Sequence, residues 1–204
     1  MLHPARAHPD HSSRGLCRIR LNWRVPTAIL AMAMTKLKPE LVPEPLWEIS
    51  ACRLLRPPSL WRAIRSDVLE RAGHRCQTCT ETTPPLYCHE QWRYEDAKCK
   101  AILTGFRIVC QKCNRAVHMG LAHSRGELPE ALAQLGRVNA ITEAEATRMF
   151  ERASATWEKR SLKNWRVNVR PRLLKAFPQL RLLVGIDTRS AVLSRHSIPT
   201  IRLD

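Results

Sequence analysis

Two short motifs, Cys76-Gln77-Thr78-Cys79 and Cys110-Gln111-Lys112-Cys113, decide how this chain folds, and 30 residues separate them. Each C-x-x-C motif turns the backbone tightly enough to present two thiolates to one ion, and two such motifs complete the tetrahedral set that zinc prefers. We therefore predict a structural Zn²⁺ site with four ligands: Cys76, Cys79, Cys110 and Cys113. Four thiolates leave no open position for water, so any catalysis must come from other groups.

Three other interpretations of these cysteines stay open. Iron can take the same four thiolates. A disulfide framework suits a small secreted chain, but the sequence has no convincing export signal, and the other four cysteines show no pairing pattern: Cys17, Cys52, Cys88 and Cys99. A thioredoxin-like redox motif needs a βαβ context and does not explain two copies. We predict zinc, with iron as the alternative that uses the same four ligands.

The segment between the two motifs is typical of a β-hairpin. Residues 86–92 favour a strand that follows two prolines, and residues 101–109 alternate as a second strand in which Gly105 would form a bulge. The chain then enters a helix at Cys110. The sequence therefore predicts a hairpin directly followed by a helix, with a cysteine motif at each end of the hairpin.

Three polar side chains of the predicted hairpin and helix indicate a chemical site. His89 lies in the middle of the first strand, and Asn114 and His118 lie four residues apart, hence on one face of the helix. We expect the hairpin and the helix to place His89 opposite His118. Such a pair can hold one divalent ion and one phosphate between the two rings.

The combined pattern resembles the HNH endonuclease family. Its parts are a C-x-x-C motif, a strand with a central histidine, and C-x-x-C-N-x-x-x-H, and the sequence C-H-E-x-W-x-Y-E-D at 88–96 is similar to a bacterial subset of that family. The resemblance covers roughly residues 60–165. It implies a small zinc-bound treble-clef ββα core. Together with the flanking segments, this predicts an α+β fold in which the core is flanked by α-helices, with an extended Pro-rich strap before it and a basic tail after it.

The resemblance also implies a function, that of a metal-dependent endonuclease hydrolysing phosphodiester bonds of DNA. His89 would be the general base that deprotonates a water molecule. His118 would bind a catalytic divalent cation such as Mg²⁺, Mn²⁺ or Ni²⁺, and Asn114 would orient the site. The alternative is a zinc-stabilised nucleic-acid-binding protein with a degenerate, inactive site. A third hypothesis is a partner-binding module that uses the helices after residue 128.

The sequence departs from the family pattern at Cys88, where Asp or His commonly contributes to the catalytic metal. A thiolate suits zinc or a late transition metal better than Mg²⁺. Either Glu90 or a substrate oxygen replaces this ligand, or the site prefers a softer ion, or it is catalytically weak; Cys88 is otherwise a small buried hydrophobic side chain. Glu90 has an alternative role as a solvated charge or as the partner of Arg93. We expect neither His74 nor His123 to be a ligand.

The flanking segments divide the chain into five predicted parts. These are an unstructured extension at 1–33, a Pro-rich strap at 34–58, the zinc-stabilised core at 59–126, a helical extension at 127–168 and a basic tail at 169–204. Met34 would then be a natural start. A cleaved signal peptide or an organellar presequence is the alternative for the extension.

The sequence predicts helices and one late strand outside the hairpin. Ser59 would cap a helix that ends before Gly73. A second helix would open at Pro129, and the capping box T-x-x-E at 142–145 would begin a third helix that runs to about residue 160. Residues 180–186 are apolar and favour a buried strand.

The charge of the chain favours a polyanionic partner. It contains 34 Lys and Arg against 18 Asp and Glu, a formal net charge of +16. Residues 159–204 hold 11 basic and 2 acidic side chains, whereas residues 67–126 hold 9 and 6, so attraction to DNA would come mainly from the tail. No apolar run approaches the roughly 18 residues of a transmembrane helix. We expect no membrane partner and a reducing, cytoplasmic location, in which the thiols stay free to bind metal.

Overall fold

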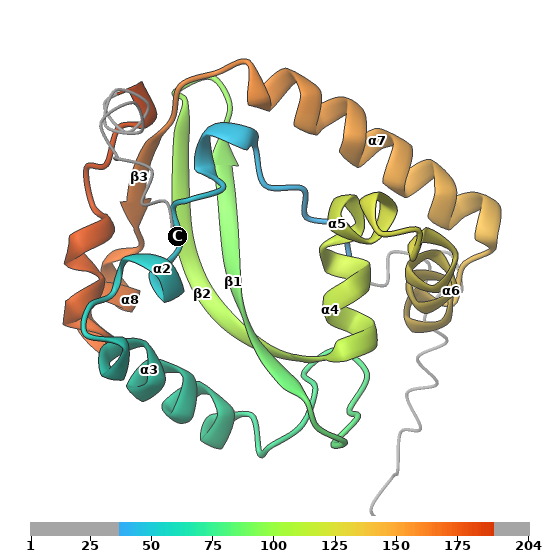
Figure 1. Ribbon diagram of the computed structural model, residues 1–204, viewed down its shortest axis with the longest axis horizontal. Coiled ribbons are helices and arrows are strands. Elements are labelled where there is room, and N and C mark those ends of the chain that lie inside the picture. Colours follow the sequence, from blue (N-terminus) through green and yellow to red (C-terminus); the bar gives the residue numbers. More distant parts are fainter. Residues whose placement is uncertain (1–36, 190–204) are drawn as a thin grey trace, which may run out of the picture. The chain divides into compact units, whose positions relative to one another are not determined.

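The computed structural model describes residues 37–189 of the 204-residue chain and has an α+β fold, as expected (Figure 1). A small three-stranded sheet lies among the helices, in the order β1-β2-β3. The chain divides into two units after Met34. The predicted extension at 1–33 and the end of the predicted tail, 190–204, lie outside the described residues.

The predicted hairpin is the centre of the fold. Strands β1 (Leu86–Glu95) and β2 (Lys100–Cys110) pair antiparallel along their whole lengths, and both are longer than the sequence indicated. The register shifts by one residue after Gln91, so that Thr104 is the extra residue of a bulge beside Gly105. The Thr104 hydroxyl donates to the Gln91 carbonyl at 2.9 Å, which satisfies the polar atoms that the bulge leaves out of the ladder.

The third strand is one that the sequence analysis missed, and the late strand that it predicted is wrong. Strand β3 (Arg166–Val169) pairs parallel with the start of β2. Most of the apolar run at 180–186 instead forms part of the 3₁₀-helix η2 (Pro178–Leu183). Its buried side chains, Leu180 and Leu183, are three residues apart, which is one turn of a 3₁₀-helix and places both on the same face.

Short helical elements precede the hairpin. They are the 3₁₀-helix η1 (Glu44–Leu46) and the helices α2 (Ala51–Leu54) and α3 (Pro58–Arg71). The predicted N-cap of α3, Ser59, is wrong by two residues: Pro57 is the cap and Pro58 the first helical residue, where the missing N–H costs no helical hydrogen bond. The predicted end is confirmed, since Gly73 follows the helix with a left-handed φ of +61°.

Within residues 37–189, five α-helices with defined bounds follow the hairpin. Four lie before β3, namely α4 (Gln111–Val117), α5 (Met119–Ser124), α6 (Leu128–Asn139) and α7 (Glu143–Ser161), and α8 (Pro171–Ala176) comes after it. The capping box of α7 is confirmed, because Thr142 Oγ1 accepts from the Glu145 amide while the Glu145 carboxylate accepts from the Thr142 amide. None of the helices in residues 37–189 combines the length and apolar character that crossing a membrane requires.

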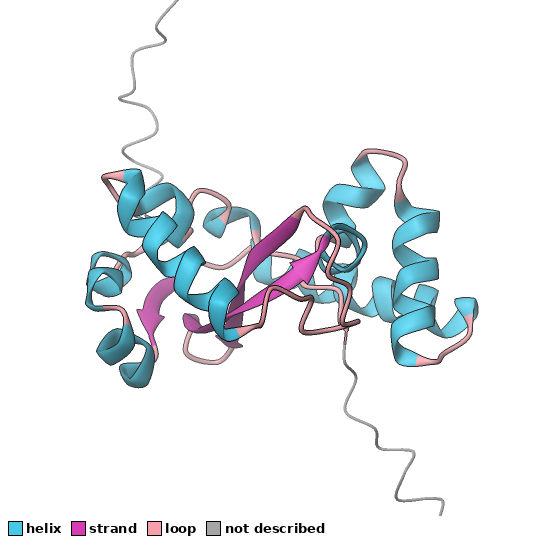
Figure 2. Ribbon diagram, turned by 90° about the horizontal axis from the view of Figure 1, so that it is seen from below, coloured by secondary structure: helices cyan, strands magenta, loops and turns pink. Residues whose placement is uncertain are grey.

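Two hydrophobic clusters hold these elements, and helices cover both sides of the hairpin (Figure 2). The first joins the cysteine end of the hairpin to α4, α5 and α6 and includes Leu37 of the strap. The second surrounds Trp165 and Leu103, and it takes Phe177, Leu180 and Leu183 from the segment expected to be a basic tail. Residues 169–189 are therefore part of the packed fold, and the predicted boundary at 168/169 falls inside β3.

Candidate metal centre and histidine cleft

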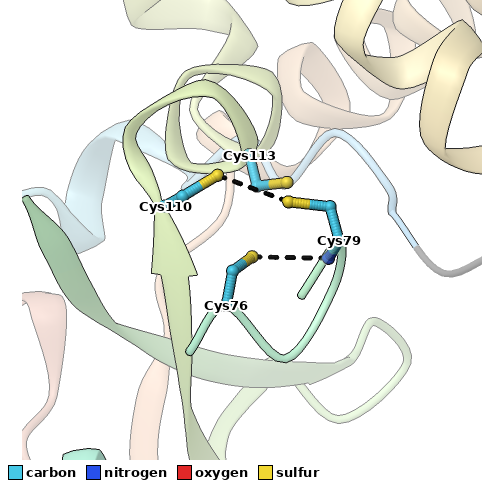
Figure 3. Close-up of side chains that lie close together, drawn as sticks. All are labelled: Cys76, Cys79, Cys110 and Cys113. Atoms are coloured by element: carbon cyan, nitrogen blue, oxygen red, sulfur yellow. Dashed lines mark hydrogen bonds between the residues drawn. The ribbon is translucent and has the colours of Figure 1, made fainter. Parts of the chain in front are cut away.

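The four predicted cysteine ligands come together in one cluster. The Sγ atoms of Cys76, Cys79, Cys110 and Cys113 all lie within 4.8 Å of one another (Figure 3). Cys79 is half-buried, and the other three are buried. Four thiols at such spacing are able to hold one metal ion, and their number and type fit a structural zinc.

Local backbone structure explains how two short motifs build this cluster. The first motif forms a tight turn in which the Thr80 amide donates to the Cys76 carbonyl at 2.9 Å and Thr80 itself has a φ of +65°. Gln77 fastens this turn to β2 through two hydrogen bonds with the backbone of Ile108, at 2.8 and 2.9 Å. The second motif begins where β2 ends, with Cys110 as the N-cap of α4.

The electrostatics of the cluster favour a cation. A hydrogen bond from the Cys113 thiol lowers the pKa of Cys76 to about 4, while the same interaction and burial raise the pKa of Cys113. This hydrogen bond favours the thiolate form of Cys76, and a divalent ion would stabilise all four cysteines as thiolates. Gln134 of α6 donates to Cys113 Sγ at 3.1 Å and fixes that ligand from outside.

Away from the cysteines, the structure brings His89 and His118 together. His89 comes from the middle of β1, and His118 is the residue at which α4 ends and α5 begins. Their ring centroids lie 4.9 Å apart at an interplanar angle of 74°, and His89 Nδ1 lies 3.3 Å from His118 Nε2. His89 is only 7% exposed. The two imidazoles therefore share one small space, as the sequence predicted.

Sequence analysis missed the third member of this site, Glu40. Its Oε2 lies 3.0 Å from His89 Nε2, on the side of the ring opposite His118. Because His89 Nε2–H donates to this carboxylate, the lone pair of Nδ1 in the neutral tautomer faces His118. Arg107 of β2 lies 3.9 Å from the other carboxylate oxygen of Glu40.

The strap holds Glu40 in place through contacts that no local pattern reveals. The Glu40 amide donates to the Val117 carbonyl at 2.8 Å, next to His118. Leu37 is fully buried and exchanges two hydrogen bonds with the Asn139 side chain, at 3.1 and 2.8 Å. A glutamate between prolines in an extended segment gives no periodic or motif signal, so its role is visible only in the folded chain.

Burial sets the protonation state of His118. Its pKa is lowered to about 4, first by burial and then by the proximity of His89. His118 is therefore a neutral imidazole at pH 7, which is the form that binds metals. Asn114 lies one turn earlier on α4, and its carbonyl accepts from the His118 amide at 2.9 Å. The side chains of all three predicted site residues line the same cleft.

Cys88 and Glu90 of β1 both had more than one expected role, and the structure shows the surroundings of each. Burial, followed by the charge of Glu90, raises the pKa of Cys88 to about 12, so this thiol stays protonated at neutral pH. Glu90 does not pair with Arg93. It accepts from the Ala51 amide at 2.7 Å and from Trp92 Nε1 at 3.0 Å, while Arg93 pairs with Glu95. Glu90 therefore ties the first turn of α2 to the hairpin.

The remaining described histidines, His74 and His123, are both exposed but differ in their distance from the cleft, since only His123 borders it. His74 is exposed and lies in the turn after α3, with a φ of +51°. His123 is also exposed and borders the cleft, with its ring 5.8 Å from that of Phe150. Within residues 37–189, the four cysteines form the single group of three or more Cys, His, Asp or Glu side chains close enough to hold a metal ion.

A cleft of about 1090 Å³ opens over the histidine pair. One wall comes from the strap and α2, another from β1, and a third from α5 and α7. The cleft therefore brings buried imidazoles, a carboxylate and several aromatic rings within reach of one ligand. Comparison of the chain with protein-family models, with curated proteins and with solved structures gives no significant match.

Proposed function

We propose that this protein is a metal-dependent endonuclease of the HNH type that hydrolyses phosphodiester bonds of DNA. The observation that carries the proposal is the Glu40–His89–His118 array, with contacts of 3.0 and 3.3 Å, on a hairpin and helix anchored by four cysteines. In this proposal, β1, β2 and α4 are the ββα core, and the cysteine cluster is the zinc centre of a treble clef. A protein that only binds nucleic acid has no need for opposed histidines and a carboxylate.

His89 is the general base of the proposed reaction. Its Nδ1 accepts a proton from a water molecule whose oxygen attacks phosphorus, while the bond from phosphorus to the 3′ oxygen breaks. Glu40 orients the ring through Nε2–H and stabilises the imidazolium that forms, as a carboxylate does in a Ser-His-Asp triad. Such a base typically contributes about 10²- to 10⁴-fold to the rate.

His118 and Asn114 serve the phosphate side of the site. The neutral imidazole of His118 is a suitable ligand for Mn²⁺, Ni²⁺ or Zn²⁺, and Asn114 orients groups beside it. A divalent cation held there would neutralise the phosphate and stabilise the leaving 3′ oxygen. Because no group of three His, Cys, Asp or Glu side chains surrounds this position among the described residues, water and phosphate oxygens would complete the shell.

The cysteine cluster has a structural role in this proposal. It fixes the start of α4 against the end of β2, and these two elements carry His118 and border the strand of His89. A metal bound by four thiolates has no free position for substrate. The cluster therefore supports the histidine pair without taking part in hydrolysis.

A second function is favoured by one specific observation. Cys88 is a protonated thiol at the position where the family commonly carries a metal-binding Asp or His. A site that lacks this ligand fits a zinc-stabilised DNA-binding protein without activity, whose net charge of +16 supplies the phosphate contacts. The nuclease needs His89 for hydrolysis, whereas in the binding protein His89 would only pack within the fold.

Nicking of supercoiled plasmid separates the two functions. Wild type, His89→Ala and the matched control His74→Ala would each be assayed with Mg²⁺, Mn²⁺, Ni²⁺ and Zn²⁺, and their zinc content would be measured by atomic emission. We expect His89→Ala to lose nicking with bound zinc unchanged, and His74→Ala, an exposed histidine outside the cleft, to keep both. Equal residual activity in wild type and His89→Ala would overturn the nuclease proposal and favour the binding protein.

A further inference from the structure

Two tryptophans that line the cleft have indole N–H groups that are already hydrogen-bonded within the protein. Trp47 follows η1 and is 54% exposed, which is unusual for so large an apolar side chain. Its Nε1 donates to the Val42 carbonyl at 2.8 Å, and Nε1 of Trp157, from α7, donates to the same oxygen at 3.0 Å. These hydrogen bonds hold both indole nitrogens at one carbonyl oxygen, so neither N–H needs a partner from a ligand.

Both indoles border the same cleft as the candidate catalytic residues. Trp47 and Trp157 line it together with His89 and His118. Four more aromatic side chains line this cleft: Trp61, Tyr87, Trp92 and Phe150. The volume of about 1090 Å³ is at the upper end of sites for small organic ligands. A flat aromatic group entering here would lie near the imidazoles and find rings on which to stack.

The charges around the indoles disfavour a phosphate at that point. Glu48 and Glu158 both line the cleft, as does Arg53, which pairs with Glu48. Arg65, from α3, also lines the cleft, and it donates to the Leu86 carbonyl at 3.1 Å. Because the Glu48–Arg53 pair is neutral and Glu158 is acidic, the part of the cleft beside Trp47 and Trp157 has no excess of positive charge, which suits an uncharged base better than a phosphodiester backbone.

From these observations we propose that the cleft binds an unpaired nucleobase of the DNA strand, stacked on Trp47 and Trp157 beside the scissile phosphate. The preferred substrate is then single-stranded or locally unpaired DNA, because the bases of an intact duplex are stacked on one another and cannot enter a pocket. This inference rests on the proposed nuclease function and specifies its substrate class. Stacking of bases on aromatic side chains is tolerant of sequence, so we expect little base preference.

The test compares binding of a fluorescent 12-nucleotide single strand with binding of the same sequence as a duplex, without added divalent ion. Because one stacked base contributes about 1–3 kcal/mol, we expect Trp47→Ala to weaken single-strand binding about 5- to 150-fold. Duplex binding should change less than about twofold. Trp47→Phe keeps a ring for stacking and should restore single-strand binding to within about fivefold of wild type. Leu162→Ala is the control, since Leu162 is 90% exposed and does not line the cleft.

Cleavage of the same two DNAs with added metal keeps the inference and the proposed function distinguishable. Faster cleavage of the single strand by wild type, reduced in Trp47→Ala, supports both. Cleavage that Trp47→Ala leaves unchanged, or equal losses of single-strand and duplex binding, overturns the nucleobase site while the nuclease stands. Selective loss of single-strand binding in a protein that cleaves neither DNA keeps the base site and overturns the nuclease.

Discussion

The cysteine cluster and the histidine cleft each include a residue of the hairpin, Cys110 and His89 respectively, but they are built in different ways. Each pair of cysteines comes from four consecutive residues, and both backbone turns form locally. Each member of the histidine site comes from a different element: His89 from a strand, His118 from the junction of two helices, and Glu40 from a strap 49 residues before His89. The first site is assembled from local pieces, and the second depends on the completed fold.

This difference predicts opposite responses to mutation. Metal binding in small zinc modules contributes about 10–16 kcal/mol, and this energy is at the same time folding energy. A hydrogen bond such as that between Glu40 and His89 contributes only about 1–3 kcal/mol. Damage to the cluster should therefore destroy the fold, whereas damage to the cleft should remove activity and leave the fold intact. The following experiments test this distinction, beginning with the largest effect.

We expect Cys113→Ser to abolish zinc binding and cooperative folding. Cys113 is fully buried, lies within 4.8 Å of the other three sulfurs and receives the Gln134 hydrogen bond. Circular dichroism during thermal unfolding, with metal analysis of the same samples, measures both effects. Cys52→Ser is the control because Cys52 is exposed on α2. A cooperative transition near the wild-type Tm in metal-free Cys113→Ser would show that the fold does not depend on the cysteine cluster.

We expect Glu40→Gln to lower DNA nicking about 100-fold or more, because the His89 imidazolium loses its counter-charge. The amide oxygen of Gln can still accept from His89 Nε2–H, so the Tm should stay within a few degrees of wild type. Initial nicking rates and differential scanning calorimetry give the two values. Glu44→Gln is the matched control, an exposed glutamate in the same strap. If both variants nick DNA equally well, Glu40 has no positioning role.

A smaller effect concerns Asp96, which follows β1 and is held by Arg160 of α7 through two hydrogen bonds of 2.9 and 2.7 Å. These bonds lower the pKa of Asp96 below its unfolded value of about 3.9. The stabilisation is therefore complete above about pH 4 and is lost as the pH falls through the folded pKa. Because the pair is partly exposed, we expect Asp96→Asn to cost about 0.5–1 kcal/mol at pH 7.

Urea unfolding of wild type and Asp96→Asn between pH 2.5 and pH 7 measures this contribution. The two free energies of unfolding should differ at pH 7 and converge at the acid end. A difference that stays constant down to pH 2.5 would show that the carboxylate charge is not its source. Glu95→Gln serves as the neighbouring control, since Glu95 pairs with the exposed Arg93 within the same strand.

For the last prediction, we expect the Cys88 thiol not to react with an alkylating reagent. Its pKa of about 12 keeps it a thiol at pH 8, whereas alkylation by iodoacetamide requires the thiolate. We expect mass spectrometry to find the exposed Cys52 alkylated well before Cys88 in the zinc-bound protein. Equally fast modification of the two would indicate a thiolate at Cys88 and would make it a candidate ligand for a soft catalytic metal.

The candidate site could be predicted in part because its strongest signals are spacings. The C-x-x-C motifs, the central histidine of β1 and the four-residue step from Asn114 to His118 are readable without a structure, and the structure brings both histidines together. The expected pairing of Glu90 with Arg93 is wrong, since a charged side chain in a strand can face solvent, a metal or a backbone amide. Its acceptance of the Ala51 N–H depends on where α2 packs.

The fold was predictable where one segment decides its own structure. The hairpin and the α7 capping box carry their signals within a few residues. Strand β3 was missed because four residues give too short an alternation, and β3 forms by pairing with a strand more than 60 residues earlier. The apolar run at 180–186 was misread because short buried 3₁₀-helices and buried strands have similar composition.

By itself, the sequence determined the four-sulfur cluster, the hairpin and the pairing of His89 with His118, because these depend on short spacings and on chain connectivity. Only the tertiary structure decided that Glu40 contacts His89, that Trp47 and Trp157 share one carbonyl, and that residues 169–189 belong to the packed fold. Contacts between residues far apart in the chain form when hydrophobic burial brings their elements together, and no local pattern encodes which polar groups then meet.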